Sequence, residues 1–320
     1  MKNHNQQNRD YSFDFIKGLL IYLVIYGHVL YAWGGSQIIY VVIYSFHMPL
    51  FIFISGYFAR RTLSLPIGDC VKRTWDHLLL PAVIWTAVYF FVFHLFANED
   101  WPRKIIYSMR CVWFLYCLSF LYFLGNIVWK FRYKYVLAIV VAVLGFSFYR
   151  IPGVAYVEYF QPIRLWPSFV MGLFWGEYRN QLHLPVRVFF IIFCLLAYFT
   201  SFAASLKGGA SLDYVLSSEN YLIRAVIYLS GSILVFALLQ FLFLPLWKAD
   251  LTRPMVIIGQ NTMGIYVMNG LIIGALSKYI KIWCIPLWMA SLIITVFLYG
   301  ATVAFKKSRS CSKLLLGESK

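Results

Sequence analysis

The residues with the clearest chemical potential are two histidines and one lysine inside long apolar stretches. Lys17 and His28 share the stretch 15–34, and His47 lies in the next one, 38–58. Imidazole exchanges protons near neutral pH, so a histidine beside a substrate suits general acid–base catalysis. Ionisable side chains are costly to bury in such stretches, which makes these three residues functional candidates.

Lys17 and His28 are eleven residues apart. On a helix this spacing is three turns plus about 20°, so both side chains share one face, about 16 Å apart. Asp14 falls on the same face. The stripe predicts the wall of a polar cavity, with an acid and a base at its rim and an imidazole deeper. Alternatively, Asp14 and Lys17 form an ion pair at the rim, and His28 only hydrogen-bonds a neighbouring helix.

A short turn at 34–37 reverses the chain, which places His28 about 9 Å and His47 about 13 Å below the outer helix ends. Two imidazoles at similar depth on adjacent helices suit a proton-transferring pair, or a base with its orienting partner. Pro49 bends the second helix, and Gly56 permits close packing. The alternative is a kinked hairpin in which the histidine has a structural part only.

Membrane helices must position these residues, because the chain is too apolar for a water-soluble domain of its size. Of 320 residues, 62% are hydrophobic and 12% are charged, and the mean hydropathy is +0.73. We predict an all-α integral membrane protein with about ten transmembrane helices in one domain, residues 1–320. The expected spans are 15–34, 38–58, 77–97, 111–129, 135–149, 162–178, 187–206, 221–246, 255–277 and 284–305.

The net charge of +16 sets the expected orientation. An even number of spans puts both termini on one side, and 18 Lys and Arg residues fall on that side against 8 on the other. Because basic residues concentrate in cytoplasmic loops, both termini, with short tails 1–14 and 306–320, are expected in the cytoplasm. The excess of basic residues is therefore assigned to cytoplasmic loops beside the membrane lipids, and no nucleic-acid partner is predicted. No His or Cys spacing resembles a metal site, so no metal is expected.

Three further basic residues are candidates. Lys72 and Arg73 lie between the second and third spans, where the positive-inside bias alone explains them. A multiply phosphorylated cytoplasmic ligand would need such a cationic mouth, and Lys17 opens to the same side. Arg164, in the sixth span, either extends to the outer interface or reaches into the cavity.

Short motifs recur along the whole chain. They are Asp14-Phe-Ile-Lys-Gly18 leading to Gly27-His28, Phe46-His-Met-Pro to Ser55-Gly-Tyr57, Lys72-Arg73 before Leu80-Pro81, Trp113-Phe-Leu115, Arg164 before Pro167-Ser-Phe169, and Asn261-Thr-Met-Gly-Ile-Tyr266. Together they resemble the acyltransferase-3 membrane proteins, which O-acylate bacterial surface sugars, and within them the fucose O-acetylase-like branch. The chain departs from that family where Lys17 replaces a usual arginine and Asn269 replaces a frequent histidine.

The resemblance implies an O-acetyltransferase of the bacterial plasma (inner) membrane that moves an acetyl group from acetyl-CoA to a sugar hydroxyl of a surface or lipid-linked glycan. It implies that His28 is the base and that His47 orients it or handles a second proton. The residues implied for CoA are Lys17, Lys72 and Arg73, and Arg164 is implied to meet the acceptor or the developing oxyanion. The other residues implied to bind substrate are Trp113, Tyr266, Asn269 and Asp14.

Two other functions remain open from the sequence. A transporter or flippase for a glycan or acylated substrate would also need polar residues at mid-depth, although the chain has no visible internal repeat. A glycan polymerase or ligase usually carries a large outer loop, whereas the longest outer connections, 97–110 and 207–220, are modest. Consumption of a thioester distinguishes the acyltransferase from both.

Overall fold

The computed structural model describes residues 10–96, 100–148, 162–179, 181, 183–207, 221–277 and 285–318. In these ranges the chain forms helices and no strand. The helices are α1 (Tyr11–Trp33), α2 (Gln37–Leu63), α3 (Ile67–Thr74), the π-helical turn η2 (Trp75–Leu79), α4 (Leu80–Phe96), α5 (Trp101–Cys111), α6 (Trp113–Trp129), α7 (Lys134–Phe148), α8 (Pro162–Tyr178), α9 (Leu184–Lys207), α11 (Tyr221–Lys248), α12 (Arg253–Gly259), α13 (Thr262–Ser277), α14 (Leu287–Lys307) and α15 (Arg309–Leu316).

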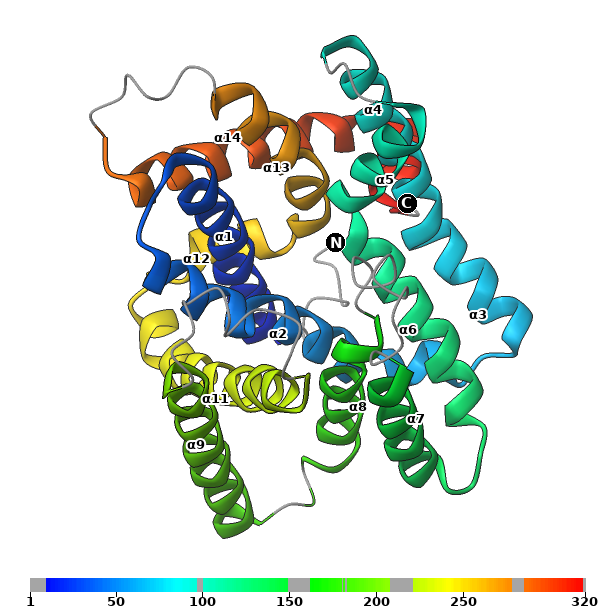
Figure 1. Cartoon of the computed structure of the whole chain (residues 1–320), viewed down its shortest axis with the longest axis vertical. Coiled ribbons are helices and arrows are strands. Elements are labelled where there is room, and N and C mark those ends of the chain that lie inside the picture. Colours follow the sequence, from blue (N-terminus) through cyan, green and yellow to red (C-terminus); the bar gives the residue numbers. More distant parts are fainter. Residues whose placement is uncertain are drawn as a thin grey trace, which may run out of the picture.

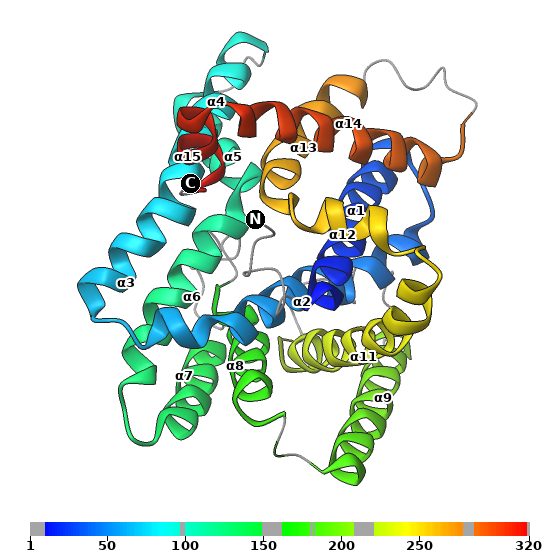
Figure 2. The ribbon, with the colours of Figure 1, turned by 180° about the vertical axis from the view of Figure 1, so that it is seen from behind.

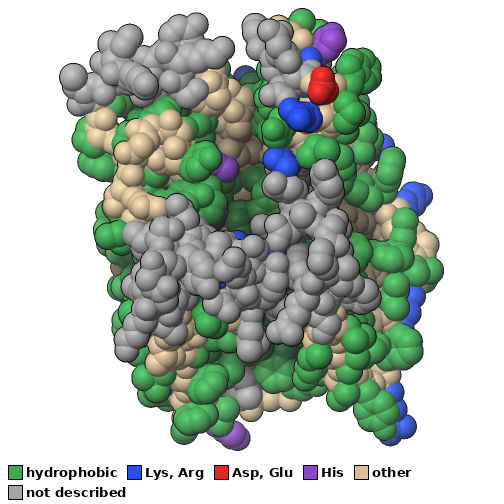
Figure 3. All heavy atoms as spheres, viewed as in Figure 1, with side chains coloured by type: hydrophobic (Ala, Val, Ile, Leu, Met, Phe, Trp, Pro, Cys, Tyr) green, Lys and Arg blue, Asp and Glu red, His purple; other side chains and the backbone are tan. Residues whose placement is uncertain are grey.

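Helix α2 runs across the middle of the molecule, with α1 on one side and α8 and α11 on the other (Figures 1 and 2). Large apolar side chains cover much of the visible surface (Figure 3). On α9, Phe189, Phe193 and Phe199 are all exposed. In water this surface would be unfavourable, but in a bilayer it meets lipid.

Six continuous helical stretches are long and apolar enough to cross a membrane: α1, α2, Ile67–Leu95, Leu184–Ala203, Ile223–Lys248 and α14. Two bent pairs, α5 with α6 at 70° and α12 with α13 at 82°, raise the number to eight if each pair is one span. Helices α7 and α8, with 15 and 17 residues, are shorter. The predicted all-α, multi-pass membrane architecture is confirmed, while the count of ten and the cytoplasmic termini stay predictions.

The expected straight span 255–277 is broken in the structure. Helix α12 ends at Gly259, and the Asn261 side chain donates a hydrogen bond of 2.7 Å to the Ile257 carbonyl, one of the carbonyls left without a helical donor. A Cβ on Gly259 would overlap with the Asp14 carbonyl of α1. The break therefore lies where α12 touches the backbone of α1, so glycine is required there.

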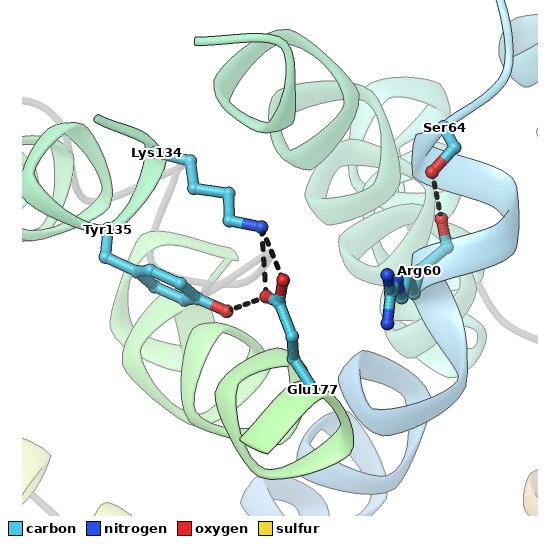
Figure 4. Close-up of polar contacts among 5 residues, drawn as sticks. All are labelled: Arg60, Ser64, Lys134, Tyr135 and Glu177. Carbon is cyan, nitrogen blue, oxygen red and sulfur yellow. Dashed lines mark hydrogen bonds and ion pairs between the residues drawn. The ribbon is translucent and has the colours of Figure 1, made fainter. Parts of the chain in front are cut away.

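A polar cluster joins α7 to α8. Lys134 Nζ lies 2.9 Å from each carboxylate oxygen of Glu177, and the Tyr135 hydroxyl donates to the same carboxylate (Figure 4). Lys134 Nζ also lies 3.6 Å from the centre of the Trp129 ring. Because each charge has a partner of opposite sign, the cluster offsets the cost of removing both from water.

Candidate active site

Four cavities adjoin one another because they share wall residues. The first, of about 320 Å³, is lined by Arg73 and His77. It shares Leu78 and Leu118 with a second cavity, which has a smaller volume of about 170 Å³ and is lined by Lys17. These two are called the Arg73 cavity and the Lys17 cavity.

The third cavity has a volume of about 540 Å³ and contains His28. This His28 cavity shares Tyr266 with the Lys17 cavity. The fourth, of about 210 Å³, is lined by His47 and shares Arg110 and Trp113 with the His28 cavity. The stripe on α1 therefore lines two cavities, with Tyr266 between them, and not one.

The His28 side chain is exposed, and it lines the largest of the four cavities. The residues on either side of it, Gly27 and Val29, are buried. Helix α1 thus presents one imidazole to the largest of the four cavities. A base in this position is able to meet a substrate hydroxyl.

His47 is 3% exposed, and its Nδ1 lies 2.7 Å from the Ile43 carbonyl oxygen. A carbonyl only accepts, so Nδ1 carries the hydrogen, and in the neutral ring Nε2 carries the lone pair. The Tyr44 ring lies 4.7 Å from the His47 ring and 6.4 Å from the His28 ring, centre to centre. The two histidines are therefore brought to one tyrosine, which was not singled out from the sequence.

Lys17 Nζ lies 2.8 Å from an Asp14 carboxylate oxygen. The Asp14 side chain is 4% exposed and the Lys17 side chain 27%. The ion pair of the alternative interpretation is present, and Lys17 also lines its cavity. Asp14 therefore holds the ammonium at the cavity wall while one side of it stays accessible.

Tyr266, Asn269 and Trp113 come together on the walls of the His28 cavity. The Tyr266 hydroxyl accepts a 3.1 Å hydrogen bond from the Phe114 N–H, one of the first amides of α6, which has no partner within its own helix. The Asn269 side chain donates to the Tyr266 carbonyl. One broken helix, α13, is thus tied to the start of another, α6.

Three predicted residues line none of the four cavities. Asp14 reaches the Lys17 cavity only through its ion pair with Lys17. Arg164 is 4% exposed on α8 and does not itself line any of the four cavities, although Leu165 beside it lines the His47 cavity. Lys72 is exposed on α3, one residue before Arg73. Only Arg73 of this basic pair reaches a cavity wall.

Three basic residues of the cavity walls were not singled out from the sequence: Lys104, Arg110 and Arg224. The segment 97–110 was expected to be a connection, whereas most of it forms α5. Lys104, Tyr107 and Arg110 recur every third residue, a helical spacing that was the available signal.

His77 was also missed. It lies in the π-helical turn η2, and its Nδ1 donates to the Gly317 carbonyl just after α15. Trp85 Nε1 donates to the Leu315 carbonyl, 3.0 Å away. π-Helical turns are frequent at functional sites, but their position has no simple sequence signal.

Residues 10–306 match a family of acyltransferase domains, acyltransferase-3. The chain belongs to this family. The predicted resemblance is confirmed, and it favours an acyltransferase over a transporter or a polymerase. Among the described residues, no group of three or more His, Cys, Asp or Glu side chains is placed to hold a metal ion.

Two curated relatives are proteins of bacteria. The chain is 29% identical over 198 residues to nodulation protein NolL of Sinorhizobium fredii (strain NBRC 101917 / NGR234), a match that covers 53% of the chain and 50% of the relative. It is 23% identical over 303 residues to nodulation protein NolL of Mesorhizobium japonicum (strain LMG 29417 / CECT 9101 / MAFF 303099), covering 82% and 76%. The chain thus spans half the length of the first relative and about three quarters of the second.

Proposed function

We propose that this protein is an O-acetyltransferase of the bacterial inner membrane, which moves an acetyl group from acetyl-CoA to a hydroxyl of a surface or lipid-linked glycan. The observation that carries the proposal is that the accessible His28 cavity and the Lys17 cavity meet at Tyr266. A base at this position is within reach of a donor from one side and an acceptor from the other.

Acetyl-CoA enters through the Arg73 cavity and then the Lys17 cavity. Its phosphates need cations, and Arg73, Lys72 and Lys17 supply them on the side predicted to be cytoplasmic. The Lys17 cavity is small and mostly apolar, with walls from Met48, Phe51 and other large side chains. Such a passage suits the slim pantetheine arm, whose thioester then lies near Tyr266.

The acceptor hydroxyl enters the His28 cavity. His28 takes the hydroxyl proton as the oxygen attacks the thioester carbonyl carbon, so that a C–O bond forms. The C–S bond then breaks, and the imidazolium returns the proton to the CoA thiolate. The products are the acetyl ester of the glycan and free CoA.

The remaining site residues position the reactants. His47, held by the Ile43 carbonyl, orients His28 through the shared Tyr44 ring or handles a second proton. Trp113 and Asn269 contact the acceptor from the cavity wall. Arg164, which is buried next to Leu165 of the His47 cavity wall, adds positive potential that favours the developing oxyanion.

The decisive experiment is mass spectrometry of surface glycans from cells with and without this protein, which should differ by one acetyl increment. In membranes, labelled acetyl-CoA should release free CoA only when acceptor glycan is present.

His28→Gln should lower transfer by about a hundredfold or more while the protein still accumulates, because an amide does not exchange protons as imidazole does. Normal transfer in His28→Gln would remove His28 as the base. Glycan movement across the membrane without thioester consumption would favour a transporter instead.

A further inference from the structure

The described residues on the cavity walls around the two histidines include basic side chains and no acidic one. Lys104 and Arg110 line the His28 cavity, and Arg110 and Arg224 line the His47 cavity. Among the described residues that line either cavity, none is Asp or Glu. Figure 3 shows a hollow on this face with basic side chains and a histidine on its walls.

Lys104 is the most telling of these residues. It is 6% exposed and lines the His28 cavity. Its ammonium has no ion-pair partner within the described part of the chain, where the four ion pairs involve other residues. Removing an ammonium from water without a partner is costly, so a buried one that faces a cavity points to a ligand of opposite charge.

Aromatic rings hold two guanidinium groups in place beside it. Arg110 lies over the Tyr107 ring, 5.1 Å from its centre. Arg224 lies 5.3 Å from the centre of the Tyr228 ring, and its Nε donates a 2.8 Å hydrogen bond to the Tyr228 hydroxyl. These ring contacts help to fix the orientation of each guanidinium.

We infer that the acceptor carries an anionic group beside the hydroxyl that is acetylated, and that Lys104 and Arg110 bind this group. The inference rests on the proposed function, since it names the substrate class of the same site. A guanidinium grips two oxygens of a carboxylate or a phosphate, and an ammonium adds a point charge. Arg110 borders both histidine cavities, so an anion held there brings the neighbouring hydroxyl close to both imidazoles.

The same chemistry has two sources: a carboxylate on the sugar ring, or a phosphate that links the sugar to a lipid. Three matched probes separate them, namely methyl glucoside, methyl glucuronide and glucose 1-phosphate. Binding of each to the purified full chain in lipid nanodiscs is measured at low salt without acetyl-CoA.

At least one anionic probe should bind about tenfold more tightly than the neutral one. Preference for the glucuronide identifies an acidic sugar, and preference for glucose 1-phosphate identifies a phosphate link. Equal binding, or no binding of either anionic probe, overturns the inference.

Variants connect the preference to the residues. Lys104→Gln and Arg110→Gln should each weaken the anionic probe about tenfold and leave the neutral probe unchanged. Lys104→Arg keeps the charge and should keep the preference, which separates loss of charge from loss of folding. Arg103→Gln removes a cation of the same helix that lines none of the cavities, and should change nothing. An unchanged preference in folded Lys104→Gln and Arg110→Gln overturns the assignment.

These binding measurements do not depend on acetyl transfer, so they test the anion site separately from the proposed function. Anion preference without consumption of acetyl-CoA in the presence of glycan would refute the acetyltransferase and leave the anion site. Acetyl transfer to a neutral glycan, with no anion preference, would refute the anion site and leave the acetyltransferase.

Discussion

Two lysines of this protein are largely removed from water under opposite circumstances. Lys134 has its ammonium 2.9 Å from both oxygens of Glu177, in a cluster that fastens α7 to α8 (Figure 4). Lys104 is 6% exposed and faces the His28 cavity without an ion-pair partner in the described ranges. The Lys134 ammonium joins two helices, and a carboxylate compensates its charge. The Lys104 ammonium has no such carboxylate in the described ranges, and on our inference a bound anion compensates its charge instead.

The predicted orientation places Lys104 on the outer side of the membrane and Lys134 on the cytoplasmic side, and labelling tests this in an all-or-none way. In a background in which all six cysteines are replaced by serine, Asp100→Cys places a thiol beside α5, and Lys130→Cys places one beside α7. A membrane-impermeant maleimide on intact cells should label the Asp100→Cys variant, and the Lys130→Cys variant only after permeabilisation. Labelling of both from the same side would contradict the predicted orientation of the two lysines.

Lys17 is intermediate between the two cases, since it has a carboxylate partner and a cavity. If it holds a CoA phosphate, Lys17→Ala should raise the KM for acetyl-CoA about tenfold to a hundredfold, the loss of one charge-assisted contact of roughly 1.5 to 3 kcal/mol. The KM for the acceptor should stay the same, and Lys17→Arg should be tolerated. If Lys17 only pairs with Asp14, then Lys17→Ala and Asp14→Ala will cause similar losses of folded protein and no donor-specific defect.

Breaking the paired cluster should affect stability and not chemistry. Glu177→Gln leaves the Lys134 ammonium without its anion, which should lower the free energy of unfolding by about 1 to 2 kcal/mol. The readout is the thermal unfolding midpoint in detergent, which should fall by a few degrees, while transfer per folded molecule stays unchanged. Tyr135→Phe is a milder control that removes one neutral donor. A large loss of transfer with an unchanged midpoint would place the cluster in the site.

The smallest effect on activity is expected at Tyr266, where the Lys17 cavity and the His28 cavity meet. Tyr266→Phe removes the acceptor for the Phe114 amide, a single hydrogen bond worth about 0.5 to 1.5 kcal/mol. The transfer rate should fall about threefold to tenfold, with both KM values little changed. A matched Tyr116→Phe, which removes a hydroxyl bonded to Thr86, should have no such effect. Equal rates in both variants would show that the junction depends on the ring of Tyr266 alone.

The sequence was sufficient for the all-helical membrane architecture and for the family, because hydropathy determines the first and local motifs the second. Lys17 and His28 were correctly expected on one helix of the core, since helical spacing is a local property. The break between α12 and α13 was not foreseen. It depends on the contact of Gly259 with the Asp14 backbone, and a contact between residues 245 positions apart leaves no local pattern.

Charge was the less reliable guide. Lys104 and Arg110 were counted as residues of an outer connection, because a basic segment between apolar stretches usually lies outside the membrane. Packing of α4 with α5 instead brings both to a cavity wall. Whether a basic residue meets lipid, water or a substrate is decided by the helices around it, and these come from distant parts of the chain.

The hydrogen bond between Tyr266 and the Phe114 amide bears on how much acetyl-CoA is lost to hydrolysis. On the proposed function, the thioester of acetyl-CoA in the Lys17 cavity lies beside Tyr266, which also lines the larger His28 cavity. Spontaneous hydrolysis would waste an activated acetyl group each time a thioester bound without an acceptor. A tyrosine held at both its hydroxyl and its backbone carbonyl would limit the passage of water from the His28 cavity to the thioester, and so would lower that loss while the enzyme waits for an acceptor.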